Sequence, residues 1–262
     1  MKTNNTHTQL KTYSLWLALL STSAMASAQT AAEIAAMSDA ERIKLSEKTE
    51  VWEPVPAKVK AIAGQPPSDA LILLDATLQQ WQSVKGDNAP WAIEDGVLTV
   101  TPGSGDIKTK EAFCDIQLHL EWRTPADIGD KQGQLRNNSG IFLQQRYEIQ
   151  ILDSYDNPTY PNGQAASVYK QTIPLVNASR APGEWQSYDI IYRAPRFAGD
   201  QLSSPGYVTV LHNGVLVQNH VEIQGSTEWI GLPQYQAHGC APLQLQDHGD
   251  KVSFRNIWVR RL

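Results

Sequence analysis

A strict alternation of apolar and polar residues between Cys114 and Arg123 constrains the fold more than any other feature of this chain. Ile116, Leu118 and Leu120 are apolar, and each is followed by a polar or charged residue. A period of two places the apolar side chains on one face of a β-strand and the polar ones on the other. The segment therefore predicts a strand that buries one face in a core and presents the other to solvent or a ligand.

Two turn signals indicate that further strands are present in the chain. Asn213-Gly214 separates two apolar alternations, and Asn-Gly in that position is a strong hairpin signal. Asp95-Gly96 marks a second hairpin, and Val252–Val259 predicts a closing strand. Many short strands with little helix and no internal repeat predict an all-β, two-sheet sandwich that begins near Leu71.

The first 28 residues have the pattern of a signal peptide. Lys2 and Lys11 form a basic region, an apolar stretch too short to span a bilayer follows, and small residues precede Gln29. We expect cleavage at about Ala28/Gln29 and a periplasmic or secreted protein with no membrane span. Residues 1–28 are accordingly assigned to a leader.

A short helix and a proline-rich arm are expected between the leader and the sandwich. Ser38 and Glu41 have the spacing of a capping box, which predicts a helix over about Asp39 to Lys48. Several prolines follow between residues 52 and 68 and indicate extended chain. Residues 29–68 thus form the helix and arm, and residues 69–262 form the sandwich domain.

The charge balance excludes nucleic acid as a partner. Without the two leader lysines, the chain carries 20 Lys and Arg against 27 Asp and Glu, and no basic cluster is present. Binding to nucleic acid needs clustered cations that neutralise phosphates. The sequence also lacks a zinc cluster, a phosphate loop and a Rossmann fingerprint, so no cofactor is predicted; whether a divalent cation such as Ca²⁺ assists stays open.

Two cysteines remain in the mature chain, Cys114 and Cys240. In an oxidising compartment they can form a disulfide. Cys114 also falls on an apolar strand face, where a buried free thiol is the alternative. The sequence leaves both states open because it does not give the distance between the two Cα atoms.

The segment from Tyr147 to Asp153 is the first candidate for chemistry. Glu148 and Gln150 share one strand face, and a β-bulge or the strand end would bring Asp153 to the same side. Two carboxylates with an amide between them can position a sugar, one acting as acid or base while the other tunes its pKa. A polar strand face on the sandwich surface is the alternative.

His248 is the second candidate, because it follows Gln246 and Asp247 and precedes Gly249. An imidazole titrates near neutral pH and serves as a proton shuttle or metal ligand, although a lone histidine is often structural. Trp185 and Trp229 lie in turn-rich segments and are candidates for stacking on sugar rings.

Seven motifs, in order, resemble the 3-keto-disaccharide hydrolase domain family, once catalogued as a domain of unknown function. The resemblance covers about residues 49–262. The motifs are Thr49–Pro56, Phe113–Arg123, Asn138–Phe142, Tyr147–Asp153, Pro182–Tyr188, Leu245–Gly249 and Phe254–Ile257.

The resemblance implies a concanavalin A-like jelly roll and cleavage of glycosides oxidised at C3 of the sugar. A C3 ketone acidifies the C2 proton, so a base can remove it, the C1 substituent can leave, and water can then add. On this basis Glu148 or His248 is the expected base and acid, with Asp153 orienting its partner or raising its pKa. The residues expected to hold sugar hydroxyls or the enolate are Gln150, Arg123, Asn138 and Gln246, with Trp185 as a stacking surface.

The resemblance and the residues together leave three functions open. The first is an exported 3-keto-glycoside hydrolase or lyase that acts after an oxidoreductase has made the ketone. The second is a non-catalytic, lectin-like carbohydrate-binding module, because jelly rolls host both functions. The third is an ordinary glycosidase, although Gln150 stands where laminarinase-type glucanases have the middle acid. Ala165–Tyr169 differs from the Cys-Gly-Ala-Ile-Tyr of many relatives, and we expect this loop near the cleft.

Overall fold

The computed structural model describes residues 30–262, so the expected leader lies outside the described part. The chain divides into two units, Met1–Ala57 and Lys58–Leu262. The described part of the first unit contains α1 (Ala31–Ala36), α2 (Asp39–Ser46) and η1 (Glu47–Thr49). Ser38 and Glu41 form the predicted capping box at the start of α2, which confirms that helix. The unpredicted α1 has a capping box of its own, between Thr30 and Glu33.

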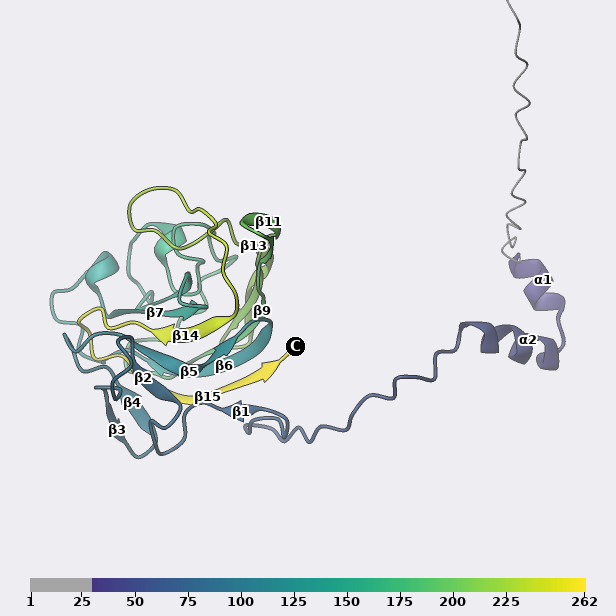
Figure 1. The fold of residues 1–262 in the computed structure, drawn as a ribbon, viewed down its shortest axis with the longest axis horizontal. Coiled ribbons are helices and arrows are strands. Elements are labelled where there is room, and N and C mark those ends of the chain that lie inside the picture. Colours follow the sequence, from purple (N-terminus) through teal and green to yellow (C-terminus); the bar gives the residue numbers. More distant parts are fainter. Residues whose placement is uncertain (1–29) are drawn as a thin grey trace, which may run out of the picture. The chain divides into compact units, whose positions relative to one another are not determined.

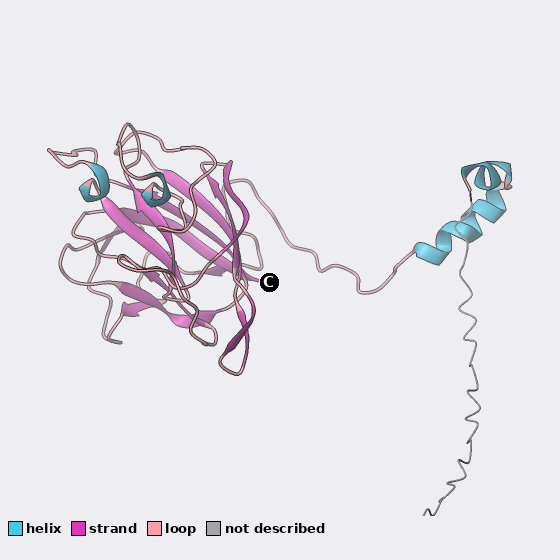
Figure 2. Cartoon of the chain, turned by 90° about the horizontal axis from the view of Figure 1, so that it is seen from above, coloured by secondary structure: helices cyan, strands magenta, loops and turns pink. Residues whose placement is uncertain are grey.

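Two antiparallel sheets build the second unit (Figures 1 and 2). The eight-stranded sheet has the order β13 (Val215–Glu222), β12 (Tyr207–His212), β9 (Gln186–Arg193), β6 (Ile116–Arg123), β15 (Ser253–Arg261), β4 (Val97–Thr99) and β3 (Ala92–Glu94), with β1 (Leu71–Ile72) beside β15. The five-stranded sheet has the order β2 (Trp81–Ser83), β5 (Ile107–Phe113), β14 (Ala241–Leu245), β7 (Asn138–Leu143) and β8 (Tyr147–Leu152). A small hairpin of β10 (Arg196–Ala198) and β11 (Gln201–Ser204) and the 3-10 helices η2 (Gly133–Leu135) and η3 (Pro161–Gly163) complete the unit.

The core lies between the two sheets and follows the predicted alternation. Leu118 and Leu120 of β6 are fully buried, and so are Ile149 and Ile151 of β8. All four belong to one hydrophobic cluster. The predicted jelly-roll sandwich is therefore confirmed, with a short N-terminal helix and an extended proline-rich segment before it. No helix in the described part of the chain is long and apolar enough to cross a membrane.

Both predicted hairpins are present. Asn213 and Gly214 join β12 to β13, and Asp95 and Gly96 join β3 to β4. All four residues have positive φ angles. Two-residue turns with both φ angles positive match the right-handed twist of the flanking strands, which is why Asn, Asp and Gly are favoured there.

The two cysteines form a disulfide, which resolves the alternative left open by the sequence. Cys114 and Cys240 have their Cα atoms 4.8 Å apart and are separated by 126 residues in the chain. Their neighbours Phe113 and Ala241 are paired residues of β5 and β14. The bond thus closes a long loop beside two adjacent strands, which stabilises the fold by about 4–5 kcal/mol in the chain-entropy model.

Candidate functional site

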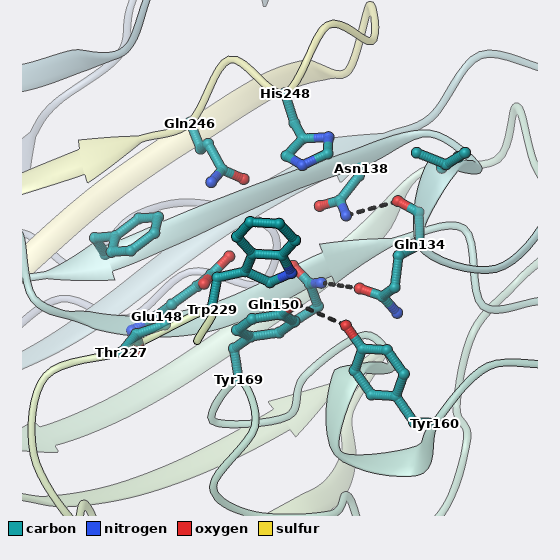
Figure 3. Close-up of a pocket in the computed structure, with 12 residues that line it drawn as sticks. Gln134, Asn138, Glu148, Gln150, Tyr160, Tyr169, Thr227, Trp229, Gln246 and His248 are labelled. Atoms are coloured by element: carbon teal, nitrogen blue, oxygen red, sulfur yellow. Dashed lines mark hydrogen bonds between the residues drawn. The ribbon is translucent and has the colours of Figure 1, made fainter. Parts of the chain in front are cut away.

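A pocket of about 470 Å³ lies on the face of the five-stranded sheet that points away from the core (Figure 3). This volume falls in the range of small-molecule sites. Its lining comes from β7, β8, the 3-10 helix η2, the β8–β9 and β13–β14 connections and the segment after β14. The lining residues are Gln134, Leu135, Asn138, Phe142, Glu148, Gln150, Tyr160, Tyr169, Thr227, Trp229, Gln246 and His248.

Strand β8 presents Glu148 and Gln150 to this pocket because its alternate residues face the core. The outer edge of β8 is covered by a loop rather than by another strand. Gln150 N–H donates to Ser167 O at 3.0 Å, and Tyr169 N–H donates to Glu148 O at 3.1 Å. These bonds place Tyr169 beside Glu148. The loop Ala165–Tyr169, which we expected near the cleft, thus contributes Tyr169 to the pocket.

Gly140 leaves space for the Glu148 carboxyl group. Gly140 lies on β7 opposite Gln150, next to Phe142, which pairs with Glu148. A Cβ atom at Gly140 would lie only 2.5 Å from Glu148 Oε1. The absence of a side chain at this position therefore lets the carboxyl group lie against the β7 backbone.

Glu148 is a buried acid without a partner. Its side chain lines the pocket, and no hydrogen bond or ion pair joins its carboxyl group to another described residue. Burial, with a smaller contribution from the negative charge of Asp106, raises the pKa of Glu148 to about 8. At neutral pH the group is mostly protonated and can give a proton to a bound ligand. Perturbed acids of this kind are concentrated at functional sites.

A network of amides forms one side of the pocket floor. Gln150 Nε2 donates to Gln134 Oε1 at 3.0 Å, and Ile151 N–H donates to Gln150 Oε1 at 3.1 Å. Asn138 Nδ2 donates to Gln134 O at 2.8 Å, as drawn in Figure 3. Both the nitrogen and the oxygen of the Gln150 amide are therefore held by the protein. Asn138 Oδ1 accepts no hydrogen bond from another described residue and can accept one from a ligand.

Gln246 and His248 reach the pocket from the segment that follows β14. The Gln246 backbone is fixed to β7, because its N–H donates to Gly140 O at 3.0 Å and its O accepts from Ser139 Oγ at 2.7 Å. Its side-chain Oε1 is buried and has no hydrogen-bond partner among the described residues. Unsatisfied buried polar atoms are rare in native proteins. Gln246 Oε1 is therefore an acceptor available to a ligand.

Asp250 anchors the loop that carries His248. It accepts a hydrogen bond from the Asn138 backbone N–H at 2.9 Å and forms an ion pair with Lys131. Asp247 adds a second anchor by accepting from Gly105 N–H at 2.9 Å. The His248 ring itself makes no hydrogen bond with a described residue and faces the pocket (Figure 3).

Aromatic side chains form the mouth of the pocket. Trp229 is 73% exposed, lines the pocket and lies in front of its floor in Figure 3. On the side away from His248, the hydroxyl groups of Tyr160 and Tyr169 are 2.7 Å apart. Exposed aromatic faces of this kind offer apolar surface to the C–H groups of a sugar ring. Trp229 is thus the tryptophan in a turn-rich segment that the fold brings to the pocket.

Asp153 lies outside the pocket. The register between β7 and β8 is regular up to Leu152, so the bulge considered for this segment is absent. Beyond the strand end, Asp153 forms a two-pronged ion pair with Arg136, at 2.8 and 3.1 Å. Both side chains are buried, and Arg136 also donates to Tyr155 O. Asp153 therefore orders the loop after β8 and does not line the cavity.

Arg123 and Trp185 are also distant from the pocket lining. Arg123 lies on the outer face of β6, in the other sheet, and its guanidinium group is 4.7 Å from the centre of the Trp185 ring. Arg255 lies over the same ring at 4.1 Å. The predicted contact of Arg123 and Trp185 with substrate has no geometric support, because their chemistry is used in this cation–π cluster.

Several lining residues carried no signal in the sequence. Gln134, Leu135, Tyr160 and Thr227 lie in loops and a short 3-10 helix, where no hydrophobic period exists. Phe142 belongs to the motif Asn138–Phe142, but nothing in that motif predicted that its side chain lines a pocket. No group of three or more His, Cys, Asp or Glu side chains in the described part of the chain could hold a metal ion.

A family model described as a 3-keto-alpha-glucoside-1,2-lyase-like domain matches residues 71–260. The chain is 25% identical over 233 residues to a 3-keto-disaccharide hydrolase of Bacteroides thetaiotaomicron, which covers 71% of this chain and 76% of that protein. A solved structure of a proposed glycosyl hydrolase from Parabacteroides distasonis has a TM-score of 0.79 at 52% identity and covers 82% of this chain and 96% of that one. A second from the same organism, with a TM-score of 0.56 at 22% identity over 74% of this chain and 94% of that one, shares the fold.

Proposed function

Because the chain belongs to the 3-keto-alpha-glucoside-1,2-lyase-like domain family, we propose that it cleaves glycosides that are already oxidised at C3. The observation that carries this proposal is Glu148, a buried acid with a raised pKa and no partner among the described residues, which lines one pocket with His248. Glu148 lies on β8, whereas His248 lies in the segment that follows β14. They supply the acid and the base that an elimination requires.

In the first step a base removes the proton from C2, which the neighbouring C3 ketone acidifies. The electrons of the C2–H bond form the enolate and then the C1=C2 double bond, while the C1–O bond breaks and the leaving alcohol takes up a proton. We assign the base to His248 and the proton on the leaving oxygen to Glu148, which burial keeps protonated at neutral pH. The products are an unsaturated ketone and an alcohol.

In the second step water adds to the unsaturated ketone. The hydroxyl group forms a bond to C1 and a proton returns to C2, which gives the free 3-keto sugar. Glu148, now ionised, accepts the proton that water loses, and protonated His248 returns a proton to C2. Both residues thereby regain their starting states, so the two steps form a complete cycle.

The amide side chains stabilise the charge that develops on the C3 oxygen. Asn138 and Gln246 line the pocket, and their N–H groups can donate to this oxygen in the enolate. Gln246 Oε1 and Asn138 Oδ1 accept from sugar hydroxyl groups. Gln150 maintains the floor through its bonds to Gln134 and the β8 backbone.

We also propose that an oxidoreductase acts before this protein and that the protein is exported. A glycoside does not carry a C3 ketone until an oxidoreductase removes two electrons and two protons from the C3 alcohol, so such an enzyme must act first. The leader-like residues 1–28 support export to the periplasm or the medium. The sugar oxidation therefore precedes cleavage in the pathway that we propose.

An ordinary glycosidase mechanism has less support. Retaining and inverting glycosidases use a pair of carboxyl groups that flank the scissile bond. Among the described residues that line the pocket, Glu148 is the only carboxylic acid. Asp153, the expected partner, is held by Arg136 outside the cavity. One acid with one imidazole suits elimination better than double displacement.

The test is release of the leaving alcohol from a 3-keto-glucoside beside the same glucoside unoxidised, each with and without a chelator. We expect turnover of the oxidised substrate alone. Cleavage of the unoxidised glucoside at a similar rate would contradict the proposal. Binding of either compound without turnover would instead favour a lectin-like module, and loss of activity with chelator would add a divalent cation to the site.

A further inference from the structure

A second cavity adjoins the pocket across a wall of two tyrosines. It has a volume of about 330 Å³, and Tyr160 and Tyr169 line both cavities. The hydroxyl–hydroxyl hydrogen bond of 2.7 Å joins the two rings. The other residues of this cavity are Asn162, Lys170, Gln171, Gln224, Glu228, Gly231, Leu232 and Pro233. A ligand that emerges from the pocket over the tyrosine wall therefore meets a second hollow.

One loop, residues 224–234, serves both cavities. Thr227 and Trp229 line the first cavity, whereas Glu228 and Leu232 line the second. The loop is fixed at its base, where Ser226 N–H donates to Gln234 O at 3.0 Å.

Two residues that follow the tyrosine wall also hold this loop. Gln171 Nε2 donates to Gly225 O at 3.0 Å, and its Oε1 accepts from Gln224 N–H at 2.8 Å. Lys170 Nζ donates to Trp229 O at 2.6 Å. These hydrogen bonds therefore hold together the two segments that line the second cavity, Lys170–Gln171 and the loop 224–234.

The chemistry of the second cavity fits a hydroxyl-rich ring. The side chains of Asn162, Gln224 and Glu228 make no hydrogen bond with another described residue, so they are free to bind a ligand. Leu232 and the tyrosine rings supply apolar surface beside these polar groups. Amides and a carboxylate next to aromatic faces can satisfy hydroxyl groups and cover the C–H face of a sugar at the same time.

We propose that the second cavity binds the leaving group of the substrate, and that this leaving group is a second sugar ring. The inference rests on the proposed function. With the oxidised ring held between Glu148 and His248, the C1 substituent is the part of a disaccharide that extends beyond the pocket. Glu228 accepts hydrogen bonds from hydroxyl groups of this second ring, and Tyr160 and Tyr169 lie beneath the glycosidic link.

The test compares two substrates and two matched variants. A 3-keto-disaccharide reaches the second cavity, whereas methyl 3-keto-glucoside, which releases methanol, does not. We expect Glu228→Ala to raise KM for the disaccharide about tenfold, the size of one lost hydrogen bond to a charged group, and to leave both kinetic constants for the methyl glycoside unchanged. Glu94→Ala, an exposed glutamate of β3, is the control and should change neither substrate.

Three results would overturn the inference. Equal losses on both substrates would show that Glu228 acts on the first pocket or on folding. Unchanged kinetics on both would show that the second cavity holds no part of the substrate, while the proposed function survives. No turnover of either substrate by the unmodified protein would remove the proposed function and the inference that depends on it.

Discussion

Strands β6 and β8 have the same alternating pattern, but they differ in whether the charged side chains on their polar faces have partners. On β6 the polar side chains are paired: Glu121 binds Arg255 at 2.6 Å and His119 binds Asp189 at 2.7 Å. On β8, Glu148 has no side-chain partner among the described residues. The polar side chains on the outer face of β6 thus pair with one another and with neighbouring strands. The outer face of β8 is instead covered by loops that enclose a cavity.

On a β-sandwich, the pairing of polar side chains distinguishes a functional face from a surface face. An alternating strand always presents a polar face, so the presence of charged residues on that face does not distinguish a site from a surface. Pairing does distinguish them, because a buried polar group without a partner is unfavourable unless a ligand completes it. We therefore expect substitutions on the unpaired face to lower activity and substitutions on the paired face to affect stability alone.

The largest expected effect comes from Glu148→Gln. The variant keeps the shape of the side chain but cannot donate a proton, so kcat/KM for a 3-keto-disaccharide should fall by about 10²–10⁴-fold. With a nitrophenol leaving group, which departs without protonation, the loss should be much smaller. Steady-state kinetics on both substrates check this. Equal losses on both would remove Glu148 from leaving-group protonation.

Removal of the disulfide should lower stability without affecting the chemistry. Cys114 and Cys240 are 126 residues apart in the chain, so their disulfide restricts the unfolded chain over a long loop. Replacing both by serine removes this restriction and should lower the free energy of unfolding by about 2–5 kcal/mol. Denaturant unfolding measures the loss, and kcat/KM of the folded variant should stay near the original value. An unchanged midpoint of unfolding would show that the bond does not constrain the unfolded chain.

Gly140→Ala should displace the carboxyl group of Glu148. The new Cβ atom would lie 2.5 Å from Glu148 Oε1, so the side chain must move, and kcat/KM should fall by about 10–100-fold. Gly239→Ala is a matched control, because no heavy atom lies within 4 Å of its added Cβ atom and its φ angle is not positive. Equal kinetics for the two variants would contradict the role given to Gly140.

The smallest effect is expected on the paired face. Glu121→Gln breaks the ion pair with Arg255, whose side chain is 43% exposed, so stability should fall by less than about 1 kcal/mol and kcat/KM should not change. Thermal unfolding and kinetics at pH 7 check both parts. A loss of activity comparable with that of Glu148→Gln would erase the distinction between the two strands.

The sequence was most informative where backbone pattern decides structure. Alternation predicted β6, Asn213-Gly214 predicted a hairpin, and Ser38 with Glu41 predicted α2, because each depends on neighbours a few residues apart. The sandwich follows from many such local patterns.

The site was only partly predictable because its assembly is non-local. The lining of one pocket brings together five of the expected residues: Glu148, Gln150, Asn138, Gln246 and His248. Arg136, which takes Asp153 away from the cavity, is 17 residues from it in the chain, and no local pattern reveals that pairing. Tyr160 lies in an irregular loop between β8 and β9, so no periodic pattern in the sequence predicts that it lines the pocket.

The most direct test is the titration of Glu148 itself, followed by carbon-13 NMR of side-chain carboxyl groups, with its resonance identified by its loss in Glu148→Gln. Burial should hold the pKa at about 8, so the acid form is lost as pH rises through that value, and kcat/KM should decline over the same range. A midpoint near the ordinary value for glutamate, about 4.3, would contradict a protonated Glu148 at neutral pH and with it the proposed acid.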